Sequence, residues 1–402
     1  MLARRLFPGG VEVGERSLDQ AIRTTRELIA NPEIPAIFEG VFEGDGVLVK
    51  VDVLQRRREN HWRLVEVKST TDLRDHHVED VAIQSYVLPF SGVKLASVWL
   101  VHINRDYVLN GTTVDPRQFF LFRNLTDRAK NLRPEVVIRL RSQMNVLAMP
   151  TPPEVPTGQH CVNPVVCEFF SRCNLPPPKD HIGYLPRLNP STLEQLAEMG
   201  VESIHEIPAD FELSEFQRRV CTAIQTGQPW FSAELKAELE SLRYPLYFMD
   251  FETVNPAIPR FSGMRPYDHL PFQWSVHVQR QPGSSTEHFE FLALDSGDPR
   301  TAFIASLCEA LGEDSGSIVV YNEQFESQRL WELAGWLPAY TDRIRGIQRR
   351  LCMRRARART TRFQANLQEW RRNSLSQRGH SIVCCSCEWL AQSVPCQFLS
   401  LR

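Results

Sequence analysis

Long apolar runs are missing from this 402-residue sequence, which has no stretch of about 18 hydrophobic residues. Residues 1–8 also lack the apolar core of a signal peptide. Cysteine is absent from residues 1–160, and all ten cysteines lie after them. These absences predict a soluble, cytoplasmic protein without a membrane partner, whose cysteines serve as thiols or metal ligands rather than as disulfides.

A strong excess of charge of either sign is also missing, because the formal net charge is -2. Basic and acidic residues are, however, distributed unevenly along the chain. Residues 351–402 contain nine Arg, no Lys and two acids, so the first 350 residues carry a net charge of -9. An acidic body of this kind does not predict a broad surface for duplex nucleic acid. The length predicts two or three domains, at roughly 150 residues per domain.

Residues 1–148 have the pattern of a compact α/β unit. The expected order is a helix, three strands, a helix and a strand, over residues 17–31, 36–43, 47–54, 62–68, 78–88 and 96–102. Two of the strands are joined by the turn Gly44-Asp45-Gly46, which is typical of a β-hairpin. This order predicts a mixed sheet.

Asp52, Glu66 and Lys68 form the first candidate site. Because successive side chains of a strand alternate between faces, Glu66 and Lys68 project together, whereas Val65 and Val67 point into the opposite layer. Two carboxylates from neighbouring strands suit a hard cation such as Mg²⁺ or Mn²⁺, and a lysine beside them can stabilise charge on a phosphate. The alternative is a solvated strand face with a simple Glu-Lys pair.

The same residues resemble the motifs of RecB-type PD-(D/E)xK nucleases, over about residues 15–175. The resemblance implies catalytic roles for Asp52, Glu66, Lys68 and Gln84, with Asp52 and Glu66 as metal ligands, and a substrate-binding role for Tyr86.

This chain departs from the family in the spacing of Gln84 and Tyr86, which are two residues apart instead of four, while Asp80 lies one helical turn before Gln84. Glu39 or Glu43 is a further candidate metal ligand, or an ordinary strand residue.

Residues 149–179 form a proline-rich linker with three evenly spaced cysteines, Cys161, Cys167 and Cys173. Buried thiols, zinc and an iron–sulfur cluster are all compatible with such a set. The resemblance to RecB-type nucleases implies a 4Fe-4S cluster held by these three thiolates. No cysteine precedes them, so the fourth ligand is expected to be His160, a distant cysteine or a residue of a longer N terminus.

Residues 180–240 are expected to be a small helical module. Asn189-Pro190 starts a helix, Gly200 ends it, and Val201 begins a second short helix that reaches Ile207. The module resembles a degenerate helix-hairpin-helix. Such a module either holds phosphate groups at helix N-termini or packs between the two α/β units.

Residues 241–350 predict a second α/β unit, with strands at 244–252, 272–278 and 317–321 and a helix at 299–311. Asp250 and Glu252 share one face of the first strand, where an acidic pair is costly unless it binds something. Together with Asn322 and Glu326 they resemble the first two motifs of DnaQ-like exonucleases, which have an RNase H-like fold. The resemblance implies catalytic, metal-binding roles for Asp250 and Glu252, a metal-binding role for Glu326 and a substrate-binding role for Asn322.

The combination of the two nuclease-like units with the cysteine linker resembles an uncharacterised bacterial family, domain of unknown function 2779, over about residues 1–350. Residues 351–402 do not fit it, since their Arg-, Ser- and Cys-rich texture has no helical periodicity. We expect them to be disordered, with neither Glu369 nor Glu388 near Asp250, and the second unit to be incomplete. A zinc site from His380, Cys384, Cys387 and Cys396 is the alternative.

Two functions remain open from the sequence. The first is a metal-dependent nuclease that hydrolyses phosphodiester bonds of DNA, or alternatively of RNA, in bacterial repair, defence or turnover. The second is a catalytically decayed nucleic-acid-binding or scaffold protein with nuclease folds. The first requires the carboxylates of each site to converge.

Overall fold

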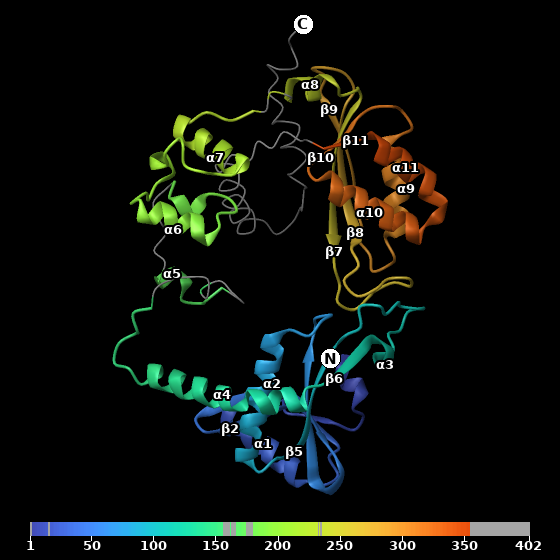
Figure 1. Cartoon of the computed structure of the whole chain (residues 1–402). Helices are drawn as coiled ribbons and strands as arrows, with labels where there is room; N and C mark the ends of the chain where they lie inside the picture. The colour runs from blue at the N-terminus through green and yellow to red at the C-terminus, as the bar shows by residue number, and fades with distance from the viewer. Residues whose placement is uncertain are drawn as a thin grey trace. The chain divides into compact units, whose positions relative to one another are not determined.

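The computed structural model describes residues 2–14, 17–155, 161, 166–173, 180–231, 233 and 235–353. Contacts divide the chain into two units. The first comprises residues 1–154 and 254–270, and the second comprises residues 155–253 and 271–402. Each contains a mixed sheet with helices (Figure 1). None of the described helices combines the length and the apolar character needed to cross a membrane.

The first unit contains a six-stranded sheet in the order β1-β2-β3-β4-β5-β6. Strands β2, β3 and β4 form an antiparallel meander, and β4 then pairs in parallel with β5. The strands are β1 (Val11–Glu12), β2 (Ala36–Gly44), β3 (Val47–Arg56), β4 (His61–Lys68), β5 (Lys94–Ile103) and β6 (Phe120–Asn124). The predicted helix–three strands–helix–strand order is therefore confirmed as a mixed α/β arrangement.

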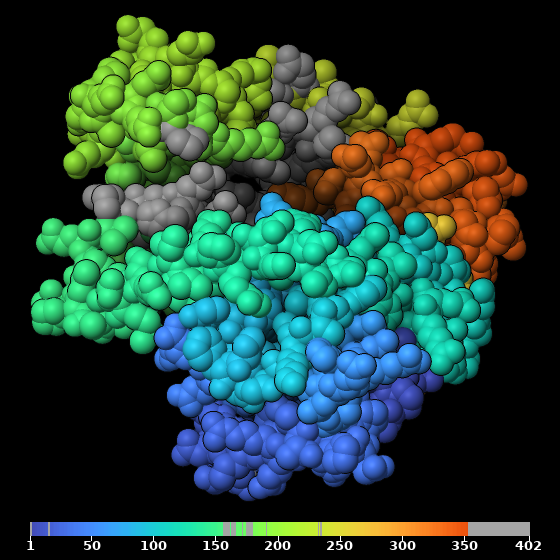
Figure 2. Space-filling model, turned by 60° about the horizontal axis from the view of Figure 1, so that its bottom comes forward, coloured from blue at the N-terminus to red at the C-terminus, as the bar shows by residue number. Residues whose placement is uncertain are grey.

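Helices α1 (Leu18–Ala30), α2 (Asp75–Val87) and α4 (Thr126–Leu147) contribute to one core together with one face of this sheet. α4 lies against α2, as the cyan and green surface of the space-filling view shows (Figure 2). Trp62 and Leu64 of β4 point into this core. A second core on the other face contains Val65 and also residues of the short helices η1 (Leu2–Leu6) and α3 (Pro116–Phe119). Alternation along β4 thus separates two buried layers.

The described part of the linker contains α5 (Phe170–Cys173), and the helical module follows it. Asn189 caps α6 (Pro190–Glu198) by accepting a hydrogen bond from the Thr192 N–H, and Gly200 ends the turn with a φ of 72°. The predicted second helix is instead the single 3-10 turn η6 (Ile204–Glu206), which packs against α7 (Glu215–Thr226), whereas α6 packs against the 3-10 turn η5 (Ile182–Tyr184). The module has its own apolar core, which includes Leu196, Ile204 and Val220.

The second sheet has the order β11-β10-β7-β8-β9, in which β10 is parallel to both β7 and β11. Its strands are β7 (Leu246–Val254), β8 (Leu270–Gln279), β9 (Thr286–Leu292), β10 (Ile318–Val320) and β11 (Leu351–Met353). Helices α9 (Arg300–Leu311), α10 (Glu323–Trp336) and α11 (Thr341–Arg350) share a core with one face of the sheet, whereas α8 (Leu235–Glu240) precedes β7.

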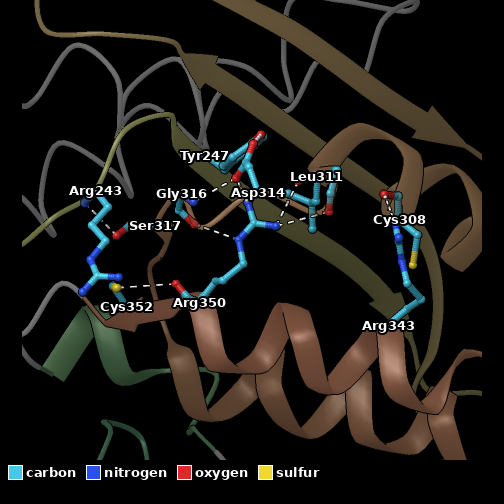
Figure 3. Close-up of polar contacts among 11 residues, drawn as sticks. Arg243, Tyr247, Cys308, Leu311, Asp314, Gly316, Ser317, Arg343, Arg350 and Cys352 are labelled. Atoms are coloured by element: carbon cyan, nitrogen blue, oxygen red, sulfur yellow. Dashed lines mark hydrogen bonds and ion pairs between the residues drawn. The ribbon is translucent and has the colours of Figure 1, made fainter.

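Arg350, the last residue of α11, fastens the connection between α9 and β10. Its guanidinium donates to the carbonyl oxygens of Leu311 (3.0 Å) and Gly316 (2.7 Å) and to the Asp314 carboxylate (2.9 Å) (Figure 3). It also lies over the ring of Tyr247 on β7, whose hydroxyl donates to Asp314. A planar five-donor group suits such a set of acceptors. This contact ties the end of α11 to the middle of the sheet.

The second sheet extends beyond the expected boundary at residue 350, because residues 351–353 pair with β10 as β11. Residues 354–402, which include the candidate zinc ligands and both acids of the predicted tail, lie outside the described residues, as does His160. The expectation of a disordered tail therefore stays a prediction.

Candidate functional sites

Strands β3 and β4 stop pairing at Asp52. Their antiparallel register ends with Val53 opposite Val65, and the next facing positions, Asp52 and Glu66, are not paired. The backbone N–H of Val67 donates instead to Oδ2 of Asp52, over 2.7 Å. The strands thus open at the level where each carries a carboxylate.

Glu66 is buried and held from two directions. Its Oε2 accepts a hydrogen bond from Nε2 of Gln84 at 2.9 Å, and its Oε1 lies 2.9 Å from Nζ of Lys68. The lysine also donates to Oδ2 of Asp80 at 2.7 Å. Asp80 and Gln84 are one turn apart on α2, so that one face of this helix holds both side chains of the Glu-x-Lys pair.

The amide of Gln84 has only one orientation that suits its neighbours. Its Nε2 faces two acceptors, the Glu66 carboxylate and, at 3.4 Å, the carbonyl oxygen of Lys50. The opposite orientation would bring an oxygen against both of them. Oε1 of Gln84 is then left buried without a hydrogen-bond partner. A buried acceptor beside two carboxylates is favourable only when a donor or a cation joins the group.

The carboxylate of Asp52 is largely buried and is repelled by the nearby carboxylate of Glu66. Burial, followed by the nearby Glu66 carboxylate, raises the pKa of Asp52 to about 6, although the Val67 N–H acts in the opposite direction. Burial would lower the pKa of Lys68, but its hydrogen bonds to Asp80 and Glu66 outweigh that effect and raise it. Lys68 therefore stays protonated at neutral pH, whereas Asp52 loses its proton at about pH 6.

Three other candidates of the first unit are not hydrogen-bond or ion-pair partners of Asp52, Glu66 or Lys68. Glu39 has a left-handed φ of 58° and pairs with Lys50 and Arg4, and its charge contributes to the raised pKa of Asp52 only after burial and Glu66. The side chain of Glu43 is exposed on β2. The hydroxyl of Tyr86 donates to Asp45 in the β2–β3 turn, at 2.5 Å, on a different side of α2 from Gln84. The structure thus brings Gln84 to the carboxylates but not Tyr86.

Asp52 and Glu66 fit a hard divalent cation in their donor chemistry, since both present carboxylate oxygens and their mutual repulsion would be relieved by positive charge. They act as a pair: among the described residues, no three His, Cys, Asp or Glu side chains group closely enough to hold a metal. Magnesium commonly uses only one or two protein carboxylates and keeps several waters. A pair is therefore sufficient for this ion.

In the second unit, Asp250 and Glu252 follow Leu246 and Phe248 along the sheet face that α9, α10 and α11 do not cover. Asp250 is half-buried and Glu252 is exposed. Glu326 comes from the first turn of α10 and is 3% exposed, yet its Oε2 has no hydrogen-bond partner. Burial, with the Asp250 carboxylate adding to it, raises the pKa of Glu326 to about 7. Asp250 and Glu326 therefore lie close enough to repel each other.

Asn322 has a local role in the structure. Its side chain caps α10 by accepting a hydrogen bond from the Phe325 N–H, at 3.4 Å. Asparagine is among the residues preferred at this position, where it satisfies an otherwise unpaired helical donor. Capping explains its place directly before the helix that carries Glu326.

Of the linker cysteines, Cys161 is buried, whereas Cys167 and Cys173 are exposed. The N–H of Cys167 donates to the carbonyl oxygen of Cys161 at 2.8 Å, which brings these two backbones together. In the part of the chain that the structure describes, the three thiols do not gather as a metal-binding group. The 4Fe-4S cluster therefore stays a prediction from the sequence.

Asp80 is the site residue to which the sequence assigned no role. The only available signal was its spacing of four from Gln84, which places both on one helix face. That spacing does not identify Lys68 as its partner, because the contact depends on how α2 packs against β4.

Residues 247–353 are similar to a protein family described as Domain of unknown function (DUF2779). The match begins in β7 and ends with β11, so it spans Asp250, Glu252 and Glu326. No curated protein and no solved structure matches the chain. The comparison supports membership of the second unit in an uncharacterised family and assigns it no activity.

Proposed function

We propose that the first unit is a Mg²⁺- or Mn²⁺-dependent nuclease of the RecB type, which hydrolyses phosphodiester bonds of DNA or RNA. One observation carries the proposal. The ladder between β3 and β4 ends at Asp52 and Glu66, where two repelling carboxylates lie beside the Lys68 ammonium. This is the arrangement expected of the three residues that resemble the catalytic motif of that family.

Each residue would have a distinct role. Asp52 and Glu66 would hold the cation, which supplies a water of lowered pKa and neutralises charge on the phosphate when it is bound. Lys68, kept protonated by Asp80 and Glu66, would stabilise negative charge that develops on the phosphate oxygens. Gln84 would fix the Glu66 carboxylate through the 2.9 Å hydrogen bond.

A second candidate site in the second unit is favoured by the buried, unpartnered Oε2 of Glu326 beside Asp250. The strand order β11-β10-β7-β8-β9 places the strand with Asp250 and Glu252 in the middle of the sheet, next to β10, which leads into α10. This topology supports the RNase H-like, DnaQ-type interpretation. The second unit would then be an exonuclease that also uses carboxylate-bound metal.

The test is cleavage of end-labelled single- and double-stranded DNA and RNA by the full chain, with and without Mg²⁺ or Mn²⁺. Glu66→Gln and Lys68→Ala should each lower the metal-dependent rate by at least about a hundred-fold. Glu43→Gln and Lys94→Ala are matched controls, because both side chains are exposed on the same sheet. Asp250→Asn separates the contribution of the second site.

The competing function is a decayed nucleic-acid-binding or scaffold protein. It predicts that the folded wild-type chain binds the oligonucleotides without cutting them in either metal. Cleavage that persists at the wild-type rate in the double variant Glu66→Gln/Asp250→Asn would also exclude both proposed sites.

A further inference from the structure

Residues 254–270 connect β7 with β8, yet they pack as part of the first unit. The N–H of Leu109 donates to the carbonyl oxygen of Met264 at 2.9 Å, and the N–H of Gly263 donates to that of Leu109 at 2.8 Å. Met264 is fully buried, and Ala257 packs against the core that contains Val65. The segment is therefore a fixed part of this unit.

Within that segment, Tyr267 is held in a left-handed conformation with a φ of 63°. Its N–H donates to the carbonyl oxygen of Pro256 at 3.0 Å, and its own carbonyl accepts a hydrogen bond from Nδ2 of Asn255. A non-glycine residue adopts this conformation only where its surroundings maintain it. The side chain is thereby directed so that its hydroxyl donates to the carbonyl oxygen of Ser69, directly after Lys68.

The carbonyl that Tyr267 contacts belongs to Ser69, the first residue after β4. The carbonyl oxygen of Thr70 accepts from Ile103 of the β5 chain, at 3.0 Å. Ser69 and Thr70 form a bend directly after the strand. Two residues before Ser69, the N–H of Val67 donates to the Asp52 carboxylate.

Two side chains thus hold the backbone on either side of Lys68. Asp52 takes the Val67 donor, and the Tyr267 hydroxyl satisfies the Ser69 acceptor. Lys68 lies between these two fixed points. The tyrosine hydroxyl thus contacts the backbone directly beyond Lys68, the last residue of β4 that pairs with β5.

We propose that Tyr267 is a positioning residue for Lys68, and that the β7–β8 connection is in this way a working part of the first site. This inference rests on the proposed nuclease function of Asp52, Glu66 and Lys68. It assigns the segment no contact with the substrate. The position of the lysine depends on a hydroxyl group nearly two hundred residues away in the sequence. This hydroxyl contacts the backbone carbonyl of Ser69 and not the lysine ammonium group.

The experiment compares Tyr267→Phe with Tyr184→Phe in the full chain. Tyr184 is an exposed tyrosine of the helical module with no side-chain hydrogen bond to another described residue. Both variants also carry Asp250→Asn and Glu326→Gln, so that the second site does not contribute. Three quantities are measured: kcat and KM for an oligonucleotide in Mg²⁺, the thermal unfolding midpoint, and amide hydrogen exchange in the peptide spanning residues 67–72.

Tyr267→Phe should lower kcat about ten-fold while KM stays within about two-fold, because a small displacement of a catalytic group costs rate rather than binding. Exchange in residues 67–72 should accelerate, the unfolding midpoint should stay within a few degrees, and Tyr184→Phe should match its parent. Unchanged kcat and exchange, or a rate loss that parallels unfolding, would overturn the inference. A parent protein that does not cleave refutes the proposed function, whereas the exchange result still decides whether the hydroxyl holds β4.

Discussion

The backbone N–H of Val67 lies 2.7 Å from the Asp52 carboxylate, at the position where β3 and β4 cease to exchange backbone hydrogen bonds. A donor that would otherwise continue the sheet is used to fix a side chain. The hydrogen bond favours the ionised carboxylate, while burial and Glu66 favour the protonated one and prevail. The position of Asp52 is thus fixed, whereas its charge depends on what binds beside it.

Cation binding to the first unit should weaken as pH falls through about 6, because a proton competes with the metal for Asp52. One pH unit below its pKa, only about a tenth of a carboxyl group is ionised, so Mn²⁺ affinity at pH 5 should be about ten-fold lower than at pH 7.5. Calorimetric titration of the double variant Asp250→Asn/Glu326→Gln, whose second site keeps only the exposed Glu252, measures this. Equal affinities at the two pH values would contradict it.

Removal of the Asp52 charge should stabilise the protein when no metal is bound. Since the pKa of Asp52 is raised above its ordinary value, its favourable contribution is complete below about pH 4 and is lost as pH rises through about 6. Asp52→Asn should therefore raise the free energy of unfolding by roughly 1–3 kcal/mol at pH 8, and by little at pH 4. Urea unfolding in EDTA tests this, with the exposed Glu43→Gln as control; an equal effect at both pH values would argue against it.

Asp80→Asn should slow metal-dependent cleavage about ten-fold, because Lys68 loses one of the two charges that hold its ammonium group. Glu79→Gln is a closely matched control. It removes a carboxylate of the same helix with similar side-chain exposure, 41% against 43%, whose partner is Arg139 and not Lys68. Cleavage rates per folded molecule decide between them. If both variants keep the wild-type rate, Asp80 does not position the lysine.

The periodicity of the sequence was sufficient to predict most of the first sheet and the shared face of Glu66 and Lys68, because strand alternation is a local property. Helix α4 was missed because Pro134 lies inside it, where proline ordinarily interrupts a helix. The opening between β3 and β4 and the Asp80–Lys68 pair depend on packing between separate elements. No local pattern encodes such contacts, and the same holds for the carbonyl of Ser69 and its partner Tyr267.

Arg350→Lys should destabilise the second unit by about 1–3 kcal/mol, although it keeps the charge. The guanidinium donates to three backbone carbonyl oxygens and one carboxylate, whereas an ammonium cannot reach all of them at once. Arg349→Lys, at the preceding and more exposed position, is the control. Denaturant unfolding followed by tryptophan fluorescence measures the difference. Equal unfolding midpoints for the two variants would show that the hydrogen bonds of the Arg350 guanidinium contribute little to stability.

Glu326 should bind a metal only where it can give up its proton. Burial and the Asp250 carboxylate raise its pKa to about 7, so its stabilising contribution is present below about pH 4.5 and is lost as pH rises through 7. Without metal, Glu326→Gln should therefore stabilise the protein at pH 8 but not at pH 4.5. With Mn²⁺ at pH 8 the order should reverse, because only the wild-type carboxylate gains from the cation. Thermal unfolding midpoints measure both effects, and Glu323→Gln, in the same helical turn but more exposed, is the control. A wild-type midpoint that Mn²⁺ does not raise above that of Glu326→Gln at pH 8 would leave the buried carboxylate without a metal-binding role.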